Sequence, residues 1–172
     1  YFDFKKVFNY VCDNNYLELA KKIMLKSCYL KRDYNSVLEK ACRNGYLEMA
    51  KWAFNSEWGK LKKWFKCDSY TNCFSTACYN NHLEVAKWLM STDIKDEINI
   101  NGVYNWNFAR ACSLNNLSIA QYLLELDPSL IITEGQKALY SCCAENQFNS
   151  AKWLYELNPN THIFFIDDKY PN

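Results

Sequence analysis

The chain has few of the residues that build flexible connectors or catalytic loops. It contains four glycines, three prolines and two histidines among 172 residues. This scarcity excludes a low-complexity linker and a glycine-rich phosphate-binding loop. No run approaches the roughly eighteen apolar residues that a membrane-spanning helix requires, so we expect no membrane segment.

The chain also lacks a surplus of either charge. Its 20 basic and 19 acidic side chains give a net charge of +1. Nucleic acids and acidic membranes normally require a strongly basic partner surface. A near-neutral chain therefore argues against bulk electrostatic attraction to either, although local patches stay open.

Cysteine, by contrast, is abundant. The chain has nine cysteines, an odd number, and five of them recur at one apolar position of a repeated pattern. Small apolar thiols repeated in this way indicate buried packing positions. We therefore expect free thiols and an intracellular, reducing compartment.

One seventeen-residue phrase occurs five times. Its copies read FNYVCDNNYLELAKKIM, LEKACRNGYLEMAKWAF, FSTACYNNHLEVAKWLM, FARACSLNNLSIAQYLL and LYSCCAENQFNSAKWLY, and they begin at Phe8, Leu38, Phe74, Phe108 and Leu139. The shared cysteine recurs at intervals of 30, 36, 34 and 31 residues, and the shared alanine keeps the same intervals. One phrase repeated at this period predicts a solenoid of stacked helical units.

Each copy predicts two short helices joined by a tight turn. In the third copy, Phe74, Ala77 and Cys78 lie at i, i+3 and i+4, which gives the first helix one apolar stripe. An asparagine or glycine follows at one fixed position, and these residues enter the left-handed conformation most readily, so we expect a helix C-cap there. The cap residues are Asn15, Gly45, Asn81, Asn115 and Asn146. The second helix is broadly apolar, so its neighbours must cover it on more than one side.

These features together resemble the ankyrin repeat, which has a period of about 33 residues, two short helices and phrases such as NGYLEMAKWAF. The resemblance covers about Phe4 to Asn160 and implies an all-α, ankyrin-like helical-repeat solenoid of five helix-turn-helix repeats. The family's Thr-Pro-Leu-His opening is absent, so we expect irregular or short hairpin finger loops. The divergent phrase is similar to those of ankyrin proteins from giant DNA viruses (mimivirus-like) or protists. The signature of the tetratricopeptide repeat is missing.

We predict a single ankyrin-repeat array over residues 1–172. Its helical phrases fall at about 7–24, 37–54, 73–90, 107–124 and 138–155, and a tail occupies 156–172. The chain begins at Tyr1 without a methionine and ends at Asn172, where another phrase would open. We therefore expect a fragment of a longer chain.

Metal and catalytic chemistry have weak support in the sequence. Cys67, Cys73, Cys78 and His82 include the ligand types of a structural zinc site, but they lack the close ligand pairs that such sites use. The other histidine, His162, lies in an apolar tail without an evident partner. We therefore expect no metal, no cofactor and no enzymatic activity.

The resemblance also implies a partner-binding surface. In ankyrin arrays the finger loops and the exposed side of the first helices line a concave groove. Carried over by position, the candidate residues are Asp13, Asn35, Arg43, Thr71, Tyr79, Asn105 and Ser113, together with Lys5, Gln136 and Ala144. Arg43 and Tyr79 are the first candidates, because arginine and tyrosine are frequent interface anchors. The alternative is that both are ordinary exposed helix residues.

One stretch, residues 55–72, escapes the repeat. It carries a basic and aromatic patch that consists of Trp58, Lys60, Lys62, Lys63, Trp64 and Lys66. Basic side chains interleaved with aromatic ones can hold phosphates and stack on bases. The favoured interpretation is an extended helix and loop with its lysines in water, since one patch on a near-neutral chain is a weak footprint.

The sequence thus predicts a non-catalytic protein–protein interaction scaffold that recognises a partner protein on its concave face. One alternative is a structural or particle-assembly protein that self-associates through the array or its ends. A less favoured alternative is nucleic-acid binding through residues 58–66. For a viral source, the expected location is the host cytoplasm or the virion.

Overall fold

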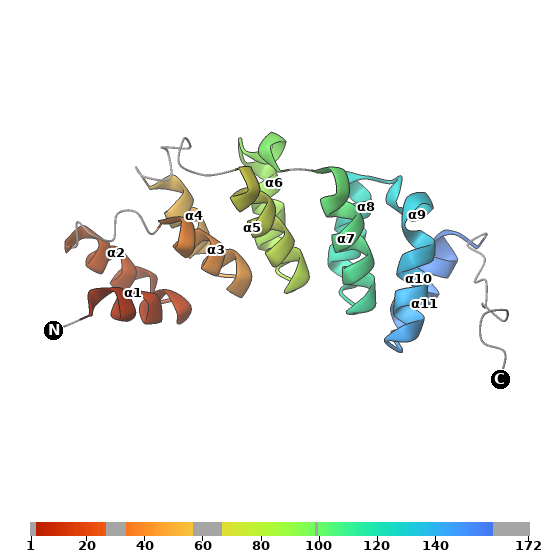
Figure 1. Cartoon of the computed structure of the whole chain (residues 1–172), viewed down its shortest axis with the longest axis horizontal. Coiled ribbons are helices and arrows are strands. Elements are labelled where there is room, and N and C mark those ends of the chain that lie inside the picture. Colours follow the sequence, from red (N-terminus) through yellow and green to blue (C-terminus); the bar gives the residue numbers. More distant parts are fainter. Residues whose placement is uncertain (1–2, 27–33, 57–66, 99, 160–172) are drawn as a thin grey trace. The chain divides into compact units, whose positions relative to one another are not determined.

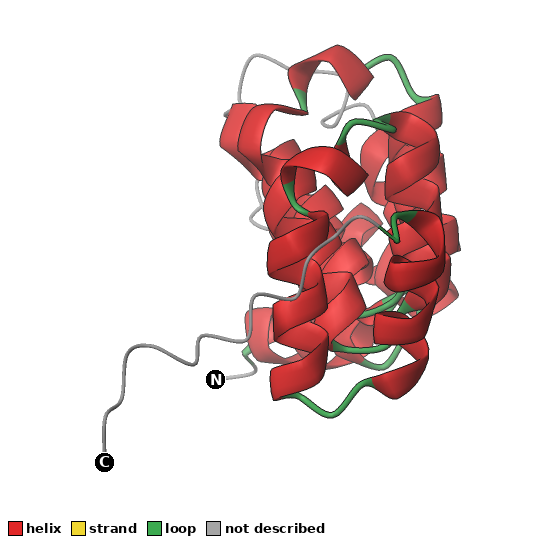
Figure 2. Cartoon of the chain, turned by 90° about the vertical axis from the view of Figure 1, so that its right-hand side faces the viewer, coloured by secondary structure: helices red, strands yellow, loops and turns green. Residues whose placement is uncertain are grey.

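The fold is described by a computed structural model for residues 3–26, 34–56, 67–98 and 100–159, with backbone alone at 34–35, 67–69 and 100–102. These residues form helices and loops, and no strand occurs among them (Figures 1 and 2). The all-α helical-repeat prediction is therefore confirmed. None of the helices in this part of the chain is both long and apolar enough to span a bilayer.

The first compact unit, residues 1–100, contains three helix pairs. These are α1 (Phe4–Asp13) with α2 (Leu17–Lys26), α3 (Tyr34–Asn44) with α4 (Leu47–Asn55), and α5 (Cys67–Tyr79) with α6 (Leu83–Ser91). A short 3₁₀ turn, η3 (Lys95–Glu97), follows. The first helices stack in order, α1 against α3 and α3 against α5, while α4 packs against α6 (Figure 1).

The second compact unit, residues 101–172, contains two helix pairs. These are α7 (Ile100–Ser113), which starts at the boundary, with α8 (Leu117–Leu126), and α10 (Gly135–Ala144) with α11 (Phe148–Leu157). The four-residue helix α9 (Leu130–Thr133) packs against α10. Each predicted phrase thus corresponds to one helix pair. The single array over residues 1–172 stays a prediction, since each unit is described by itself.

The loops between repeats differ from a hairpin wherever they are described. The link after α6 contains η3, and the link after α8 contains α9, so both are built from helical turns. The links at residues 27–33 and 57–66 lie outside the described residues. The expectation of irregular finger loops therefore holds for the two links that the structure describes.

The turn inside each helix pair is the same at all five positions. The predicted cap residues have φ values of 57°, 74°, 62°, 59° and 56° at Asn15, Gly45, Asn81, Asn115 and Asn146. In the third pair, the amide of His82 donates to the carbonyl of Ala77 over 2.8 Å, and the amide of Asn81 donates to Cys78 over 3.2 Å. This pair of bonds is the Schellman motif, which satisfies carbonyls that the ending helix leaves unpaired.

The core consists of the residues that the repeated phrase shares. The alanines of the second helices, Ala20, Ala50, Ala86 and Ala120, are completely buried. Small side chains at these sites let neighbouring helices approach closely, and larger residues fill the space around them. Phe54 meets Trp88 edge to face with ring centroids 5.5 Å apart, and Phe108 lies 6.5 Å from Trp153.

The residue after each turn connects one repeat to the preceding one in unit 1. The Tyr46 hydroxyl donates to the carbonyl of Asp13 over 3.1 Å. At the equivalent position of the next repeat, His82 Nε2 lies 3.0 Å from the carbonyl of Arg43. Since a carbonyl only accepts, Nε2 carries the proton of this histidine. His82 is therefore a scaffold residue, as its place in the repeat predicted.

Gly45 shows why one copy has glycine where the other four have asparagine. A Cβ atom built on Gly45 would overlap the imidazole ring of His82. In unit 2 the side chain of the turn residue itself contacts the next repeat, since the Ser150 hydroxyl donates to Oδ1 of Asn115 over 3.0 Å. The turn residue therefore takes part in repeat stacking in both units, through chemistry that changes from one copy to the next.

The repeated cysteines are buried at four of their five positions. Cys12, Cys42, Cys78 and Cys112 are buried, whereas Cys143 is exposed. The prediction that Cys143 shares this burial is wrong, because the described residues place no further repeat over it. Burial raises the pKa of Cys12 to about 11 and that of Cys78 to about 12. Both thiols are therefore neutral packing groups at physiological pH.

The contact between Gly45 and His82 can be measured as a stability coupling. Gly45→Ala should lower the free energy of unfolding by about 2–3 kcal/mol, because alanine is strained at positive φ and displaces the His82 ring from its hydrogen bond. Urea unfolding measures this loss. In a His82→Ala background the same substitution should cost about 1 kcal/mol less. Equal costs in the two backgrounds would show that the ring contact is unimportant.

Cys78 makes stability depend on alkaline pH. Its pKa is raised from 9.0 to about 12 in the folded chain, so the unfolded chain loses this proton first. The protonated Cys78 thiol makes its full contribution to the free energy of unfolding below pH 9. This contribution falls by about 1.4 kcal/mol for each pH unit as the pH rises toward 12. The wild type should therefore lose its advantage in unfolding free energy over Cys78→Ala as the pH rises from about 8 to about 10.5. Parallel curves would contradict the assignment.

Candidate functional site

The exposed side of the first helices carries three of the predicted binding residues of unit 1. Asp13, Arg43 and Tyr79 each follow the repeated cysteine by one residue, at the ends of α1, α3 and α5. All three side chains are exposed, and Tyr79 exposes 41% of its surface. The structure therefore places an acid, a base and an aromatic residue at equivalent sites of successive repeats.

Asp13 also belongs to a polar contact between repeats. Lys40 Nζ lies 3.0 Å from Oδ1 of Asp13 and donates to Oδ1 of Asn9 over 3.2 Å. The Asp13 carboxylate is about half exposed, so the ion pair is screened by water and contributes little to stability. It does fix the direction of both side chains on the surface.

Two further residues of unit 1, Thr71 and Asn35, are also predicted to bind a partner. Thr71 is half-buried on α5. Asn35 lies on α3, but its side chain is outside the described residues. The prediction that these two positions contribute to a binding surface stays a prediction.

Unit 2 has an open groove of about 640 Å³ between its two first helices. Predicted residues Asn105 and Ser113 both line it on the α7 side, and Ala144 lines it on the α10 side. Ser113 is buried, and its hydroxyl donates to the carbonyl of Arg110 over 2.9 Å. Ser113 is therefore part of the groove wall, with its hydroxyl already used by the helix.

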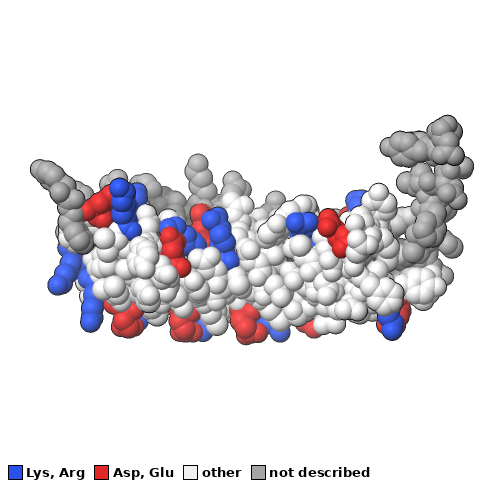
Figure 3. Space-filling view, turned by 90° about the horizontal axis from the view of Figure 1, so that it is seen from below, with Lys and Arg blue, Asp and Glu red and all other residues white. Residues whose placement is uncertain are grey.

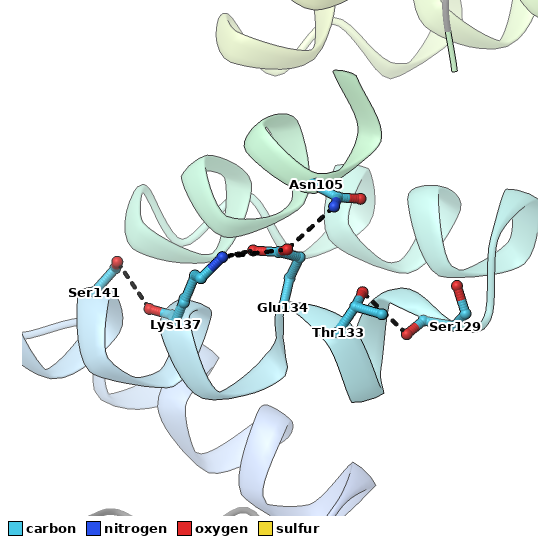
Figure 4. A network of polar contacts seen from close by, with 6 residues as sticks. All are labelled: Asn105, Ser129, Thr133, Glu134, Lys137 and Ser141. Carbon is cyan, nitrogen blue, oxygen red and sulfur yellow. Dashed lines mark hydrogen bonds and ion pairs between the residues drawn. The ribbon is translucent and has the colours of Figure 1, made fainter. Parts of the chain in front are cut away.

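A polar network holds the two walls of this groove together (Figure 4). Glu134 lies just before α10, and its Oε1 accepts a hydrogen bond from Nδ2 of Asn105 on α7 over 3.1 Å. Lys137 Nζ lies 3.2 Å from Oε2 of the same carboxylate. The Glu134 side chain is only 11% exposed, and the amide and the ammonium group compensate the cost of burying its charge.

Glu134 and two exposed aromatic residues of the groove were not among the residues predicted from the sequence. Trp106 and Tyr140 line it with 56% and 70% of their surfaces exposed. Asp3 stands at the same place before α1, but its Oδ1 caps that helix by accepting from the amides of Lys5 and Lys6, whereas the Glu134 side chain makes no such cap. The aromatic residues lie on faces that the repeat leaves variable, and no shared pattern marks them.

The charged residues of the described surface are mixed in sign. In Figure 3, acidic and basic side chains lie beside one another, and uncharged residues cover most of the remaining surface. Lys21 pairs with Glu18 at 2.7 Å, and Lys51 pairs with Glu48 at 2.8 Å. The predicted basic and aromatic patch, Trp58, Lys60, Lys62, Lys63, Trp64 and Lys66, lies outside the described residues and stays a prediction.

Chemistry at the cysteines is limited by burial and hydrogen bonding. No group of three or more potential metal ligands is found in the part of the chain that the structure describes. Cys73 and Cys78 are buried, and His82 Nε2 is occupied by the Arg43 carbonyl. A thiol with a raised pKa is a poor nucleophile, so Cys78 is unsuited to covalent catalysis.

Comparison with known proteins identifies the repeat. The family described as ankyrin repeats (3 copies) matches residues 8–104 and residues 76–164. Together the two matches cover residues 8–164, which run from within α1 to beyond the end of α11. Neither a curated protein nor a solved structure matches the chain. Ankyrin repeats are generally protein–protein interaction modules and are typically non-catalytic. The chain therefore belongs to the ankyrin-repeat family.

Proposed function

We propose that this protein is a non-catalytic scaffold that recognises a partner protein with the exposed side of its first helices. The observation that carries the proposal is the exposure of aromatic side chains there, at Tyr79 in unit 1 and at Trp106 and Tyr140 in unit 2. Folding leaves 41%, 56% and 70% of these three side chains exposed, although it buries the aromatic residues of the core. Aromatic residues are enriched at interface centres because they bury a large area with little loss of conformational entropy.

The proposed surface of unit 1 is centred on Arg43 and Tyr79, with Asp13, Asn35 and Thr71 around them. The residues that build the repeat stay the same from copy to copy, whereas Asp13, Arg43 and Tyr79 differ in charge and shape at one structural position. On a surface of this kind, each repeat contributes a different side chain, and the partner is selected by the combination of contacts along the stacked helices. Mixed charge also favours a protein partner over the uniformly negative backbone of a nucleic acid.

The proposed surface of unit 2 is the groove between α7 and α10. The hydrogen bond from Asn105 on α7 to Glu134 joins the two walls before a partner binds, and Lys137 on α10 pairs with the same carboxylate. A preorganised groove loses less entropy on binding than a flexible one. Trp106 and Tyr140 then supply apolar contact area at its rim.

The origin and the compartment also belong to the proposal. The divergent repeat phrase supports an origin in a giant DNA virus or a protist. Free cysteines that are buried at Cys12, Cys42, Cys78 and Cys112 support a reducing compartment, such as the host cytoplasm. Imaging of the tagged chain in its native cell tests the location, and secretion into the medium would contradict it.

Partner binding through unit 1 can be tested with Tyr79→Ala and Arg43→Ala. Each should weaken binding of proteins captured from the native cell by at least about fivefold, equivalent to about 1 kcal/mol. The melting temperature should stay unchanged, because both side chains are exposed. Quantitative mass spectrometry of the captured proteins measures the loss.

Glu84→Ala is the matched control, because Glu84 is exposed on the second helix of the same repeat as Tyr79. It should leave capture unchanged. Equal capture by all three variants would contradict a binding surface on the first helices of unit 1. The pair Trp106→Ala and Tyr140→Ala applies the same test to the groove of unit 2. Loss of the captured material on nuclease treatment would instead support nucleic-acid binding.

A further inference from the structure

The turn of the second helix pair contains the dipeptide Asn44–Gly45. Asparagine is a chemically labile residue, and it loses its side-chain amide most readily when glycine follows, because a residue without Cβ lets its peptide nitrogen approach the asparagine side chain. The sequence contains one further Asn–Gly dipeptide, Asn101–Gly102, where the structure describes the backbone alone. The other four turns have asparagine at the position of Gly45. The second turn is therefore chemically distinct from the other four.

The side chain of Asn44 is less restrained than the asparagines that stand at its position in the first and third repeats. Nδ2 of Asn14 donates to the carbonyl of Tyr10 over 2.8 Å, and Nδ2 of Asn80 donates to the carbonyl of Thr76 over 2.9 Å. Within the described residues, the Asn44 side chain makes no such hydrogen bond. It can therefore rotate toward the peptide bond that follows it.

The peptide nitrogen of Gly45 is also less restrained than its counterparts. In the other four turns, the amide of the left-handed residue donates to the carbonyl three residues earlier over 3.1 or 3.2 Å. In the described structure, the Gly45 amide makes no equivalent bond to Cys42. The amide of Tyr46 closes this turn by donating to the carbonyl of Ala41 over 2.9 Å. Asn44 is the last residue of α3, where helices fray most easily.

We propose that Asn44 is a site of spontaneous deamidation in the folded chain. The Gly45 nitrogen loses its proton to water and forms a bond to Cγ of Asn44, while the Cγ–Nδ2 bond breaks and ammonia leaves. One water molecule then opens the five-membered succinimide. Cleavage between the nitrogen and Cγ gives aspartate, whereas cleavage between the nitrogen and the main-chain carbonyl carbon gives isoaspartate, whose backbone also runs through Cβ. The reaction consumes one water and releases one ammonia, without a change of oxidation state.

The third repeat restrains this reaction from outside the turn. The His82 ring packs against Gly45 at the place where a Cβ atom would lie, and its Nε2 lies 3.0 Å from the carbonyl of Arg43. These two contacts hold the peptides on both sides of Asn44. The nitrogen reaches Cγ only when the end of α3 turns away from the ring. The deamidation rate therefore depends on how often the contact between the second and third repeats opens.

The products disturb the same contact. Isoaspartate adds one atom to the backbone between α3 and α4, so the hydrogen bond from the Tyr46 amide to the Ala41 carbonyl no longer fits the turn. Both products place a carboxylate at the C-terminus of α3, where the helix dipole disfavours negative charge. Deamidation at Asn44 therefore loosens the stacking of the second and third repeats. The reaction is separate from partner recognition and does not depend on it.

Storage of the folded full chain in a mildly alkaline buffer at physiological temperature tests the proposal, with peptide mapping by mass spectrometry. The peptide that contains Asn44 should gain the mass difference between an amino and a hydroxyl group. Its modified fraction should exceed those of Asn14 and Asn80 at least about tenfold. Enzymatic methylation that is specific for isoaspartate should label the same peptide. Asn44→Gln should remove both signals, because glutamine would have to close a larger ring.

His82→Gln separates the effect of the structure from that of the dipeptide. Glutamine occurs at this position in the fifth repeat, as Gln147, but it has no ring to cover Gly45. Deamidation of Asn44 should become at least about threefold faster in this variant. Glu84→Ala is the matched control, because Glu84 is exposed on the helix that follows His82. It should leave the rate unchanged.

The chain unfolded in urea supplies the reference, because Asn44–Gly45 and Asn101–Gly102 are both released from the fold there and should both react. A folded chain whose Asn44 stays intact while the unfolded chain reacts to completion would overturn the proposal. An unchanged rate in His82→Gln would overturn the control by the third repeat, provided that circular dichroism shows a folded variant. His82→Asn, with the residue found at this position in the fourth repeat, replaces a variant that does not fold.

Discussion

The left-handed residue at each turn is the constraint on which the rest of this structure depends. It ends the first helix, and the Schellman hydrogen bonds that follow hold the start of the second helix at a fixed distance and direction. The next residue then faces the preceding repeat, as Tyr46 and His82 do. A single backbone conformation therefore sets both the shape of the repeat and the contact between repeats.

Small residues at the stacking surface follow from that geometry. Helices that approach closely need alanine or cysteine at the contact, since a larger side chain would be overpacked. The same closeness removes water from the thiols and raises the pKa of Cys78, so the repeated cysteines gain packing and lose reactivity. Cys143 confirms that this burial depends on stacking. It occupies the same repeat position as the buried cysteines but is exposed, and no described repeat follows it.

Variation between the copies carries what is specific to this protein. Gly45 and His82 are matched to each other, Asn115 and Ser150 use the same part of the turn with different chemistry, and Glu134 joins α7 to α10. The surface residues vary more freely, because they have no stacking partner to match. The binding surface is proposed from such departures from the repeat.

The sequence by itself determined the helix pairs, the five cap residues and the scaffold role of His82, because these depend on short-range patterns that recur in register. Only the tertiary structure decided that Ser113 is buried, that Cys143 is exposed and that Asn105 binds Glu134. It also revealed the groove with Trp106 and Tyr140. These properties depend on which repeat lies next to which surface, and the sequence of a single phrase contains no information about its neighbour. Each repeat encodes its own helices and turn, whereas the exposure of a side chain depends on which repeats stack against it.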